Sequence, residues 1–128
     1  MEHLPNLTIL LVEDNTETRE LYADILKESG HYVTMVTDGK EALVEISKNQ
    51  YDLVLLDMMM PIVNGIQFLK QLKTINLSKQ PKIIILTNIS HDHIIDDALE
   101  NGADGFLMKS DMTPQQFISK IHEVCFPK

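Results

Sequence analysis

Five residues of this chain have side chains suited to phosphate and metal chemistry, and all of them lie where apolar runs end. They are Glu13, Asp14, Asp57, Thr87 and Lys109. Carboxylate oxygens with room left for water are the ligands that Mg²⁺ prefers, and a carboxylate can also attack phosphorus to form an acyl phosphate. A hydroxyl and an ammonium group can stabilise the charge on the transferred group. The set therefore indicates phosphoryl transfer to a carboxylate beside magnesium.

The apolar runs before these residues have the length of buried strands, and amphipathic segments separate them. We predict strands over residues 8–12, 32–36, 53–56, 82–86 and 105–108. We predict helices over residues 16–29, 40–48 and 92–101, from 65 past 72, and from 114 past 124. Strands that alternate with helices predict a parallel sheet covered on both faces. The predicted fold is therefore α/β with five strands and five helices. For the strand order we take the flavodoxin-like arrangement, 2-1-3-4-5.

The predicted strand order brings the acidic residues together. Strands 8–12 and 53–56 are neighbours in this order, so Glu13, Asp14 and Asp57 converge at one edge of the sheet. Carboxylates that lie close together repel one another unless a cation or a shifted pKa relieves them. Taken singly, a carboxylate after a strand is usually a helix cap, a threonine a turn residue and a lysine a solvated charge. Their joint position at one edge favours a binding site.

Composition fits one domain and argues against several classes of partner. A chain of 128 residues with a net charge of −8 would be repelled by nucleic acid and by anionic membranes. The single cysteine, Cys125, excludes an internal disulfide and fits a reducing compartment. No apolar run approaches the roughly 18 residues of a membrane span, and the start lacks a signal-peptide pattern. We predict a soluble, cytoplasmic protein.

The sequence resembles the receiver domain of two-component response regulators, of the chemotaxis-regulator kind, over essentially its whole length. The motifs that carry the resemblance are the pair Glu13-Asp14, the segment DMMMPIVNG from Asp57 to Gly65, Thr87 after an Ile/Leu strand, and Lys109 preceded by Gly105-Phe106. The resemblance implies that Asp57 accepts a phosphoryl group from a phosphohistidine of a sensor kinase or phosphotransfer protein. No effector domain is expected, so residues 1–128 are predicted to form one stand-alone receiver.

The resemblance also implies a role for each site residue. Asp14, Asp57 and the backbone carbonyl of Met59 would bind Mg²⁺, with Glu13 helping through a water molecule. The phosphoryl group would draw the Thr87 hydroxyl inward, and Phe106 would rotate into the space that is vacated. The face built from the fourth helix, fifth strand and fifth helix would then control a downstream protein partner.

Four positions depart from the commoner pattern of the family. Ser110 follows Lys109 where proline is usual, and a cis bond before serine costs about 2.5–4 kcal/mol. We therefore predict a trans bond, or a strained cis bond if the lysine cannot otherwise reach the site. Asn88 replaces a small residue and narrows access to the site. Met59 and Ile89 cannot orient a hydrolysing water, so we predict a long-lived acyl phosphate. A role in merely covering the loop surface is an equal alternative for these two side chains.

Other functions remain open at this point. A hydrolase with an aspartyl phosphate would usually carry a second acid two residues after the nucleophile, where this chain has Met59. A phosphate-independent interaction module of the same fold would not need the complete set of acids, threonine and lysine. A flavin carrier is disfavoured because the turn after the first strand is acidic. His91 and His93 give only a weak metal signal, and His31 and His122 have no spacing that pairs them.

Overall fold

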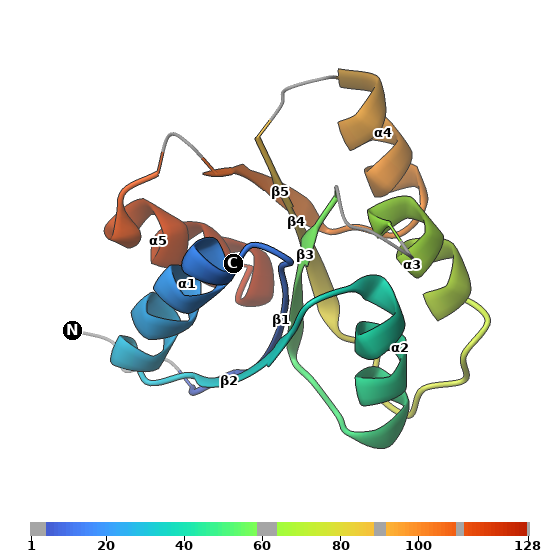
Figure 1. The fold of residues 1–128 in the computed structure, drawn as a ribbon, viewed down its shortest axis with the longest axis horizontal. Helices are drawn as coiled ribbons and strands as arrows, with labels where there is room; N and C mark the ends of the chain where they lie inside the picture. The colour runs from blue at the N-terminus through green and yellow to red at the C-terminus, as the bar shows by residue number, and fades with distance from the viewer. Residues whose placement is uncertain (1–4, 59–63, 89–91, 110–111, 128) are drawn as a thin grey trace.

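A parallel five-stranded sheet forms the centre of this computed structural model, which describes residues 5–58, 64–88, 92–109 and 112–127. The strands are β1 (Thr8–Val12), β2 (Tyr32–Val36), β3 (Leu53–Asp57), β4 (Lys82–Thr87) and β5 (Gly105–Met108). They pair in the order β2-β1-β3-β4-β5 (Figure 1). The flavodoxin-like α/β fold expected from the sequence is confirmed.

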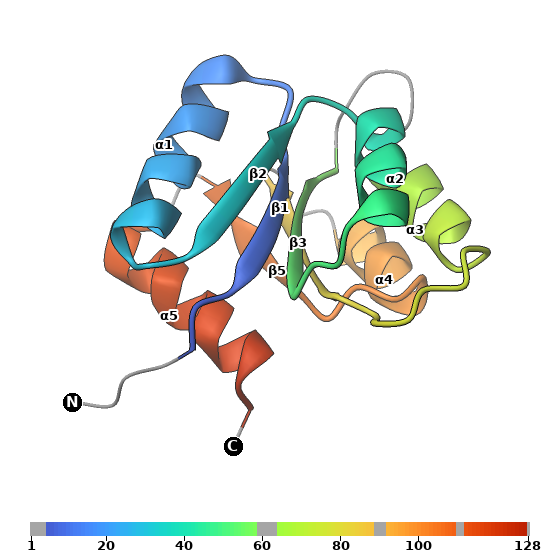
Figure 2. The same ribbon diagram turned by 90° about the horizontal axis from the view of Figure 1, so that it is seen from below.

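Five helices cover the two faces of the sheet. They are α1 (Thr16–Glu28), α2 (Gly39–Lys48), α3 (Gly65–Leu72), α4 (Asp92–Glu100) and α5 (Pro114–Cys125). Helices α1 and α5 lie together on one face, and α2, α3 and α4 lie on the other (Figures 1 and 2). Because all strands are parallel, each helix carries the chain back to the end of the sheet where the next strand starts. The carboxyl ends of the strands therefore gather on one side of the molecule, which we call the carboxyl edge of the sheet. The amino ends of the strands lie on the opposite side, the amino edge.

Side chains from alternate strand positions pack into two separate apolar layers, as the two-residue period of a strand requires. Ile9, Leu11 and Leu55 pack in the layer of α1 and α5. Leu10 and Leu56 pack in the layer of α2, α3 and α4. All five residues of the central strand β3 are buried, which explains its continuous apolar run.

Side-chain caps start the helices next to the carboxyl edge of the sheet. The Asn15 side chain accepts a hydrogen bond of 2.9 Å from the backbone N–H of Thr18 at the start of α1. Thr113 forms a capping box with Gln116 at the start of α5, with Pro114 in the first turn. Such caps satisfy backbone N–H groups that have no partner within the helix. They fix where the loops at this edge end.

The buried face of α1 differs from the sequence prediction. The apolar pattern predicts that Leu21 lies with Ile25 and Leu26 on the inner face, but Leu21 is 57% exposed. Tyr22 and Ala23 are buried beside Leu26 instead. Positions 22, 23 and 26 share one face because residues three and four apart in a helix are neighbours. The aromatic ring of Tyr22 therefore contributes to the core near the carboxyl edge.

A histidine pair at the amino edge of the sheet was also not expected. The His31 Nε2 and His122 Nε2 atoms lie 3.4 Å apart, and the rings meet edge to face. The Nδ1 atom of His31 accepts a hydrogen bond of 3.0 Å from the backbone N–H of Leu7. Sequence spacing does not pair these two histidines, which meet because α5 returns along the sheet to the loop before β2.

Candidate functional site

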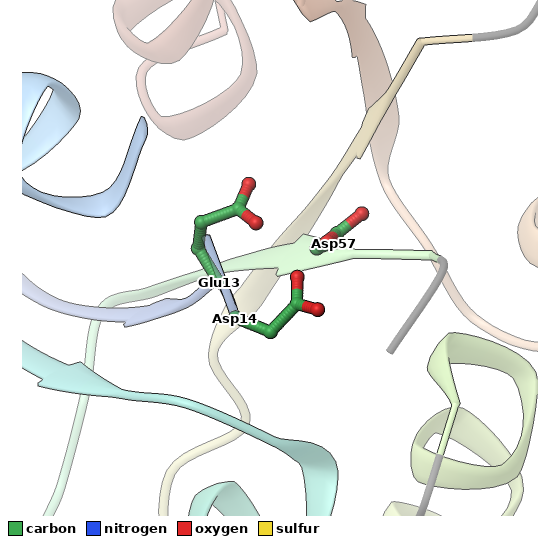
Figure 3. A group of neighbouring side chains, drawn as sticks. All are labelled: Glu13, Asp14 and Asp57. Carbon is green, nitrogen blue, oxygen red and sulfur yellow. The ribbon is translucent and has the colours of Figure 1, made fainter. Parts of the chain in front are cut away.

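The acidic residues meet where β1 and β3 end side by side. Val12 is in register with Leu56, so the residues that follow β1 lie beside Asp57. One carboxylate oxygen from each of Glu13, Asp14 and Asp57 lies within 4.8 Å of the others (Figure 3). Glu13 and Asp57 are buried, whereas Asp14 is exposed. The convergence predicted from the strand order is therefore present.

Lys109 extends into this acidic group from the end of β5. Its ammonium group forms a salt bridge with Glu13, and its Nζ atom lies 3.3 Å from Asp57 Oδ1. The side chain is only 11% exposed. Burial by itself would lower the pKa of Lys109, but the hydrogen bond to Glu13 and the charge of Asp57 outweigh burial and raise this pKa above its ordinary value. The lysine is thus held in its charged form next to Asp57.

Glu13 is held on two sides. One carboxylate oxygen, Oε1, contacts Lys109, and the other, Oε2, accepts a hydrogen bond of 3.1 Å from the backbone N–H of Asn15. Its side chain is fully buried. The sequence reasoning missed the pair with Lys109, although a buried carboxylate needs a cation and Lys109 is the basic residue at a predicted strand end. Glu13 therefore orients the lysine.

Thr87 and Asn88 lie at the end of β4, between Asp57 and Lys109. Thr87 is buried as the last residue of the strand, whereas Asn88 is exposed. On the side of β3, Gly65 lies so close that a Cβ atom there would be 3.0 Å from the Cα atom of Met58. The first turn of α3 can pack against the end of β3 only because this residue has no side chain.

A cavity of about 610 Å³ opens over these residues. Its polar walls include Asp14, Asp57, Thr87, Asn88 and Lys109. Its apolar walls come largely from α1 and α5, where the rings of Tyr22 and Phe117 stack with centroids 4.9 Å apart. Burial raises the pKa of Tyr22; Lys109 opposes that rise, and Glu13 and Asp57 add to it. The charged site thus opens into a partly apolar cavity.

Phe106 lies apart from the charged residues. It sits in β5, in register with Ile85 of β4, and is 37% exposed. Its side chain is therefore partly in solvent in this structure, in contrast to the buried aromatic rings of Phe68 and Phe117.

Comparison with known protein families decides the identity of the fold. The family described as the response regulator receiver domain matches residues 9–122. This chain belongs to that family.

Several relatives and solved structures share the receiver domain. Two-component response regulator 24 of Arabidopsis thaliana is 34% identical over 131 residues, which cover 98% of this chain and 92% of the relative. The transcriptional regulatory protein HprR of Escherichia coli is 37% identical over 105 residues, which cover 80% of this chain and 45% of the relative. The chemotaxis response regulator CheY4 of Vibrio cholerae has a TM-score of 0.86 at 25% identity, covering 94% of this chain and 99% of that one.

Many curated relatives are longer than this receiver domain. The chain spans 45% of HprR, 50% of the phosphate regulon regulator PhoB of Escherichia coli and 14% of a gliding motility regulatory protein of Myxococcus xanthus. The match to these proteins thus concerns their receiver domains. Among the residues that the structure describes, no helix has both the length and the apolar character needed to cross a membrane.

The acidic edge of this receiver domain fits a magnesium ion. Ligands about 2.1 Å from Mg²⁺ lie at most about 4.2 Å from one another across the ion. The three carboxylate oxygens lie within 4.8 Å of one another, so a small side-chain movement would bring them to that spacing. Receiver domains bind Mg²⁺ at such an acidic site. Glu13 is occupied by Lys109 and Asn15, which leaves Asp14 and Asp57 as the carboxylates best placed for direct coordination.

Some predicted features lie outside the described residues. They are the carbonyl and side chain of Met59, the side chain of Ile89, the bond between Lys109 and Ser110, and His91. The expectations for these positions stay predictions. His93, which belongs to α4, is exposed.

Proposed function

We propose that Asp57 is the phosphoacceptor of this receiver domain and takes its phosphoryl group from a phosphohistidine of a sensor kinase or histidine phosphotransfer protein. The observation that carries the proposal is the placement of the charged Lys109 ammonium, bound to Glu13 and 3.3 Å from Asp57, beside the exposed carboxylate of Asp14. One cation among three acids leaves this sheet edge negatively charged, which favours a bound metal ion, and Asp57 lines a cavity through which a phosphoryl donor can reach it.

The transfer joins Asp57 to phosphorus and releases the donor. A carboxylate oxygen of Asp57 attacks the phosphorus atom, the bond from phosphorus to the donor nitrogen breaks, and the electron pair stays on the imidazole. Mg²⁺ held by Asp14, Asp57 and the Met59 carbonyl would neutralise charge on the phosphoryl oxygens. Lys109 stabilises the same oxygens through its ammonium group, and the buried Thr87 hydroxyl donates to them.

The output is a change on the face built from α4, β5 and α5, which contacts a protein partner. Leu99 of α4 is 42% exposed and Phe106 of β5 is 37% exposed, so this face carries apolar surface. Movement of Thr87 toward the phosphoryl group lets Phe106 turn inward and changes that surface. Nucleic acid is not a direct partner, because the net charge of −8 opposes phosphate backbones.

The acyl phosphate is long-lived in this proposal. Met59 and Ile89 lie two residues beyond Asp57 and Thr87, and neither side chain can bind a water molecule for hydrolysis. Replacing Met59 by Asn should therefore shorten the lifetime of the phosphorylated protein, measured by the loss of phosphate from purified phosphoprotein. Val44→Asn, a polar change at an exposed position on α2 away from this cavity, is the control and should leave the lifetime unchanged. No shortening in Met59→Asn would sink the idea.

A phosphate-release assay distinguishes the receiver from a hydrolase. With Mg²⁺ and acetyl phosphate, a receiver takes up at most one phosphoryl group per chain and releases it slowly. With phosphate monoesters it should show no sustained release of phosphate. Continuous turnover of such esters would favour the hydrolase instead. Absence of any phosphorylation, with a folded protein, would favour a phosphate-independent interaction module.

A further inference from the structure

Arg19 is the only arginine in the chain, and it binds the loop that carries the acidic pair. It is the fourth residue of α1, at the end of the first turn. Its Nη1 atom donates a hydrogen bond of 2.8 Å to the backbone carbonyl of Glu13 and lies 3.3 Å from that of Asp14. Its Nη2 atom lies 3.4 Å from Thr16 Oγ1. The guanidinium group thus joins the helix to the two peptide units that precede it.

The two carbonyl groups belong to residues whose carboxylates form the acidic edge. A second backbone hydrogen bond holds Glu13 in place, because its own N–H donates to the Val36 carbonyl at 3.2 Å. Asp14, in contrast, is exposed at the loop. Fixing its carbonyl also limits rotation of its peptide unit, and with it the direction in which the Asp14 carboxylate points.

We propose that Arg19 is a positioning residue for the magnesium site and that it acts by holding the carbonyl groups of Glu13 and Asp14 in one orientation. The inference rests on the proposed function, because it assumes that the Asp14 and Asp57 carboxylates bind the ion. A planar guanidinium group with several N–H donors suits this task, whereas a lysine presents one compact ammonium group. Loss of the partners that orient metal ligands typically costs about 10- to 100-fold in metal affinity.

The charge of Arg19 acts in the opposite direction to its hydrogen bonds. A positive charge near the site repels Mg²⁺, so removing the charge alone would strengthen magnesium binding. Removing the hydrogen bonds would weaken it, because the free protein would then have to order the loop when the ion binds. The direction of the change in affinity therefore separates a positioning role from an electrostatic one.

The test compares the magnesium affinity of four proteins by NMR titration with MgCl₂ at constant ionic strength. They are the wild type, Arg19→Met, Arg19→Lys and the control Lys27→Met, which removes one positive charge from an exposed position later in α1. Arg19→Met should bind Mg²⁺ about tenfold more weakly, at the lower end of the effects seen for such partners. Arg19→Lys keeps the charge, and its magnesium affinity should lie between those of Arg19→Met and the wild type. Lys27→Met should match the wild type.

Phosphorylation by acetyl phosphate gives an independent reading. The Mg²⁺ concentration for half-maximal rate should rise in Arg19→Met by the same factor, while the rate at saturating Mg²⁺ stays at the wild-type value. Arg19→Lys guards against loss of folding in Arg19→Met, and thermal unfolding without Mg²⁺ measures any such loss separately.

Two results would overturn the role of Arg19 alone. One is tighter binding in Arg19→Met with unchanged binding in Arg19→Lys, which would assign the effect to charge. The other is wild-type affinity in both variants, which would make the contact purely structural. If the wild type itself neither binds Mg²⁺ nor accepts phosphate, the proposed function fails, and the inference fails with it.

Discussion

Buried polar side chains have different kinds of partner at the two edges of the sheet. At the carboxyl edge, Glu13 and Asp57 are buried as partners of the cation of Lys109. At the amino edge, His31 is buried against His122, with their Nε2 atoms 3.4 Å apart. The residues at the carboxyl edge are charged and line a cavity. The two histidines at the amino edge pack together more favourably when both rings are neutral.

Hydrogen bonding fixes the proton positions at the amino edge. His31 Nδ1 accepts from the Leu7 N–H, so the neutral ring carries its proton on Nε2 and donates it to His122. Burial lowers the pKa of both histidines, and the neighbouring His122 lowers that of His31 further. Within the described part of the chain, the buried carboxylates lie where an oppositely charged group meets them beside a cavity, which is also where the chemistry is proposed.

Removing the cation of the carboxyl edge should have the largest effect on stability. Lys109→Met leaves the carboxylates of Glu13 and Asp57 buried without their ammonium partner, and the free energy of unfolding should fall by about 3 kcal/mol at neutral pH. Chemical denaturation measures this change. The double variant Glu13→Gln, Lys109→Met removes a charge of each sign and should recover part of the loss. A double variant less stable than Lys109→Met would contradict the pairing.

Acidification should weaken the amino edge. Both histidines have a lower pKa in the folded protein than in the unfolded chain, so their contribution is present above the ordinary histidine pKa and is lost as the pH falls toward the folded values. We expect the free energy of unfolding to fall between pH 7.5 and pH 5.5. His122→Gln should flatten this dependence, measured by denaturation at several pH values. A His122→Gln variant with the same slope as the wild type would contradict this assignment.

A lysine at the amino edge supplies the smallest expected effect. Lys79 pairs with Asp52, but the lysine side chain is 51% exposed, compared with 11% for Lys109. Exposed ion pairs contribute roughly 0–1 kcal/mol, so Lys79→Met should cost far less stability than Lys109→Met in the same denaturation experiment. Equal losses in the two variants would show that burial does not distinguish the edges.

The sequence predicts the fold and the acidic edge because both follow from local patterns. Five apolar runs separated by amphipathic segments indicate a parallel sheet, whose strands have the flavodoxin-like order. Polar residues at the strand ends then lie on one edge. The strands differ from the prediction in two last residues, since Asp57 and Thr87 belong to β3 and β4. Helices α1, α2 and α4 each differ from it by one residue at one end.

Contacts between distant segments could not be predicted in the same way. The pair of Glu13 with Lys109 and the pair of His31 with His122 join residues 96 and 91 positions apart. No periodicity connects such residues, and their meeting depends on how α5 and β5 pack against β1. The burial of Tyr22 was missed for another reason. Leu21 has the more apolar side chain, which favours it as the buried residue, but Leu21 is exposed and Tyr22 occupies the buried position of α1.

Intact mass measurement after incubation with Mg²⁺ and acetyl phosphate tests the central claim most directly. The wild type should gain the mass of one phosphoryl group, the gain should disappear when Mg²⁺ is chelated, and Asp57→Asn should show no gain. Asp24→Asn, which alters an exposed acid on α1, should be phosphorylated like the wild type. A wild type that gains nothing, or an Asp57→Asn variant that gains the same mass at the same rate, would contradict Asp57 as the phosphoacceptor.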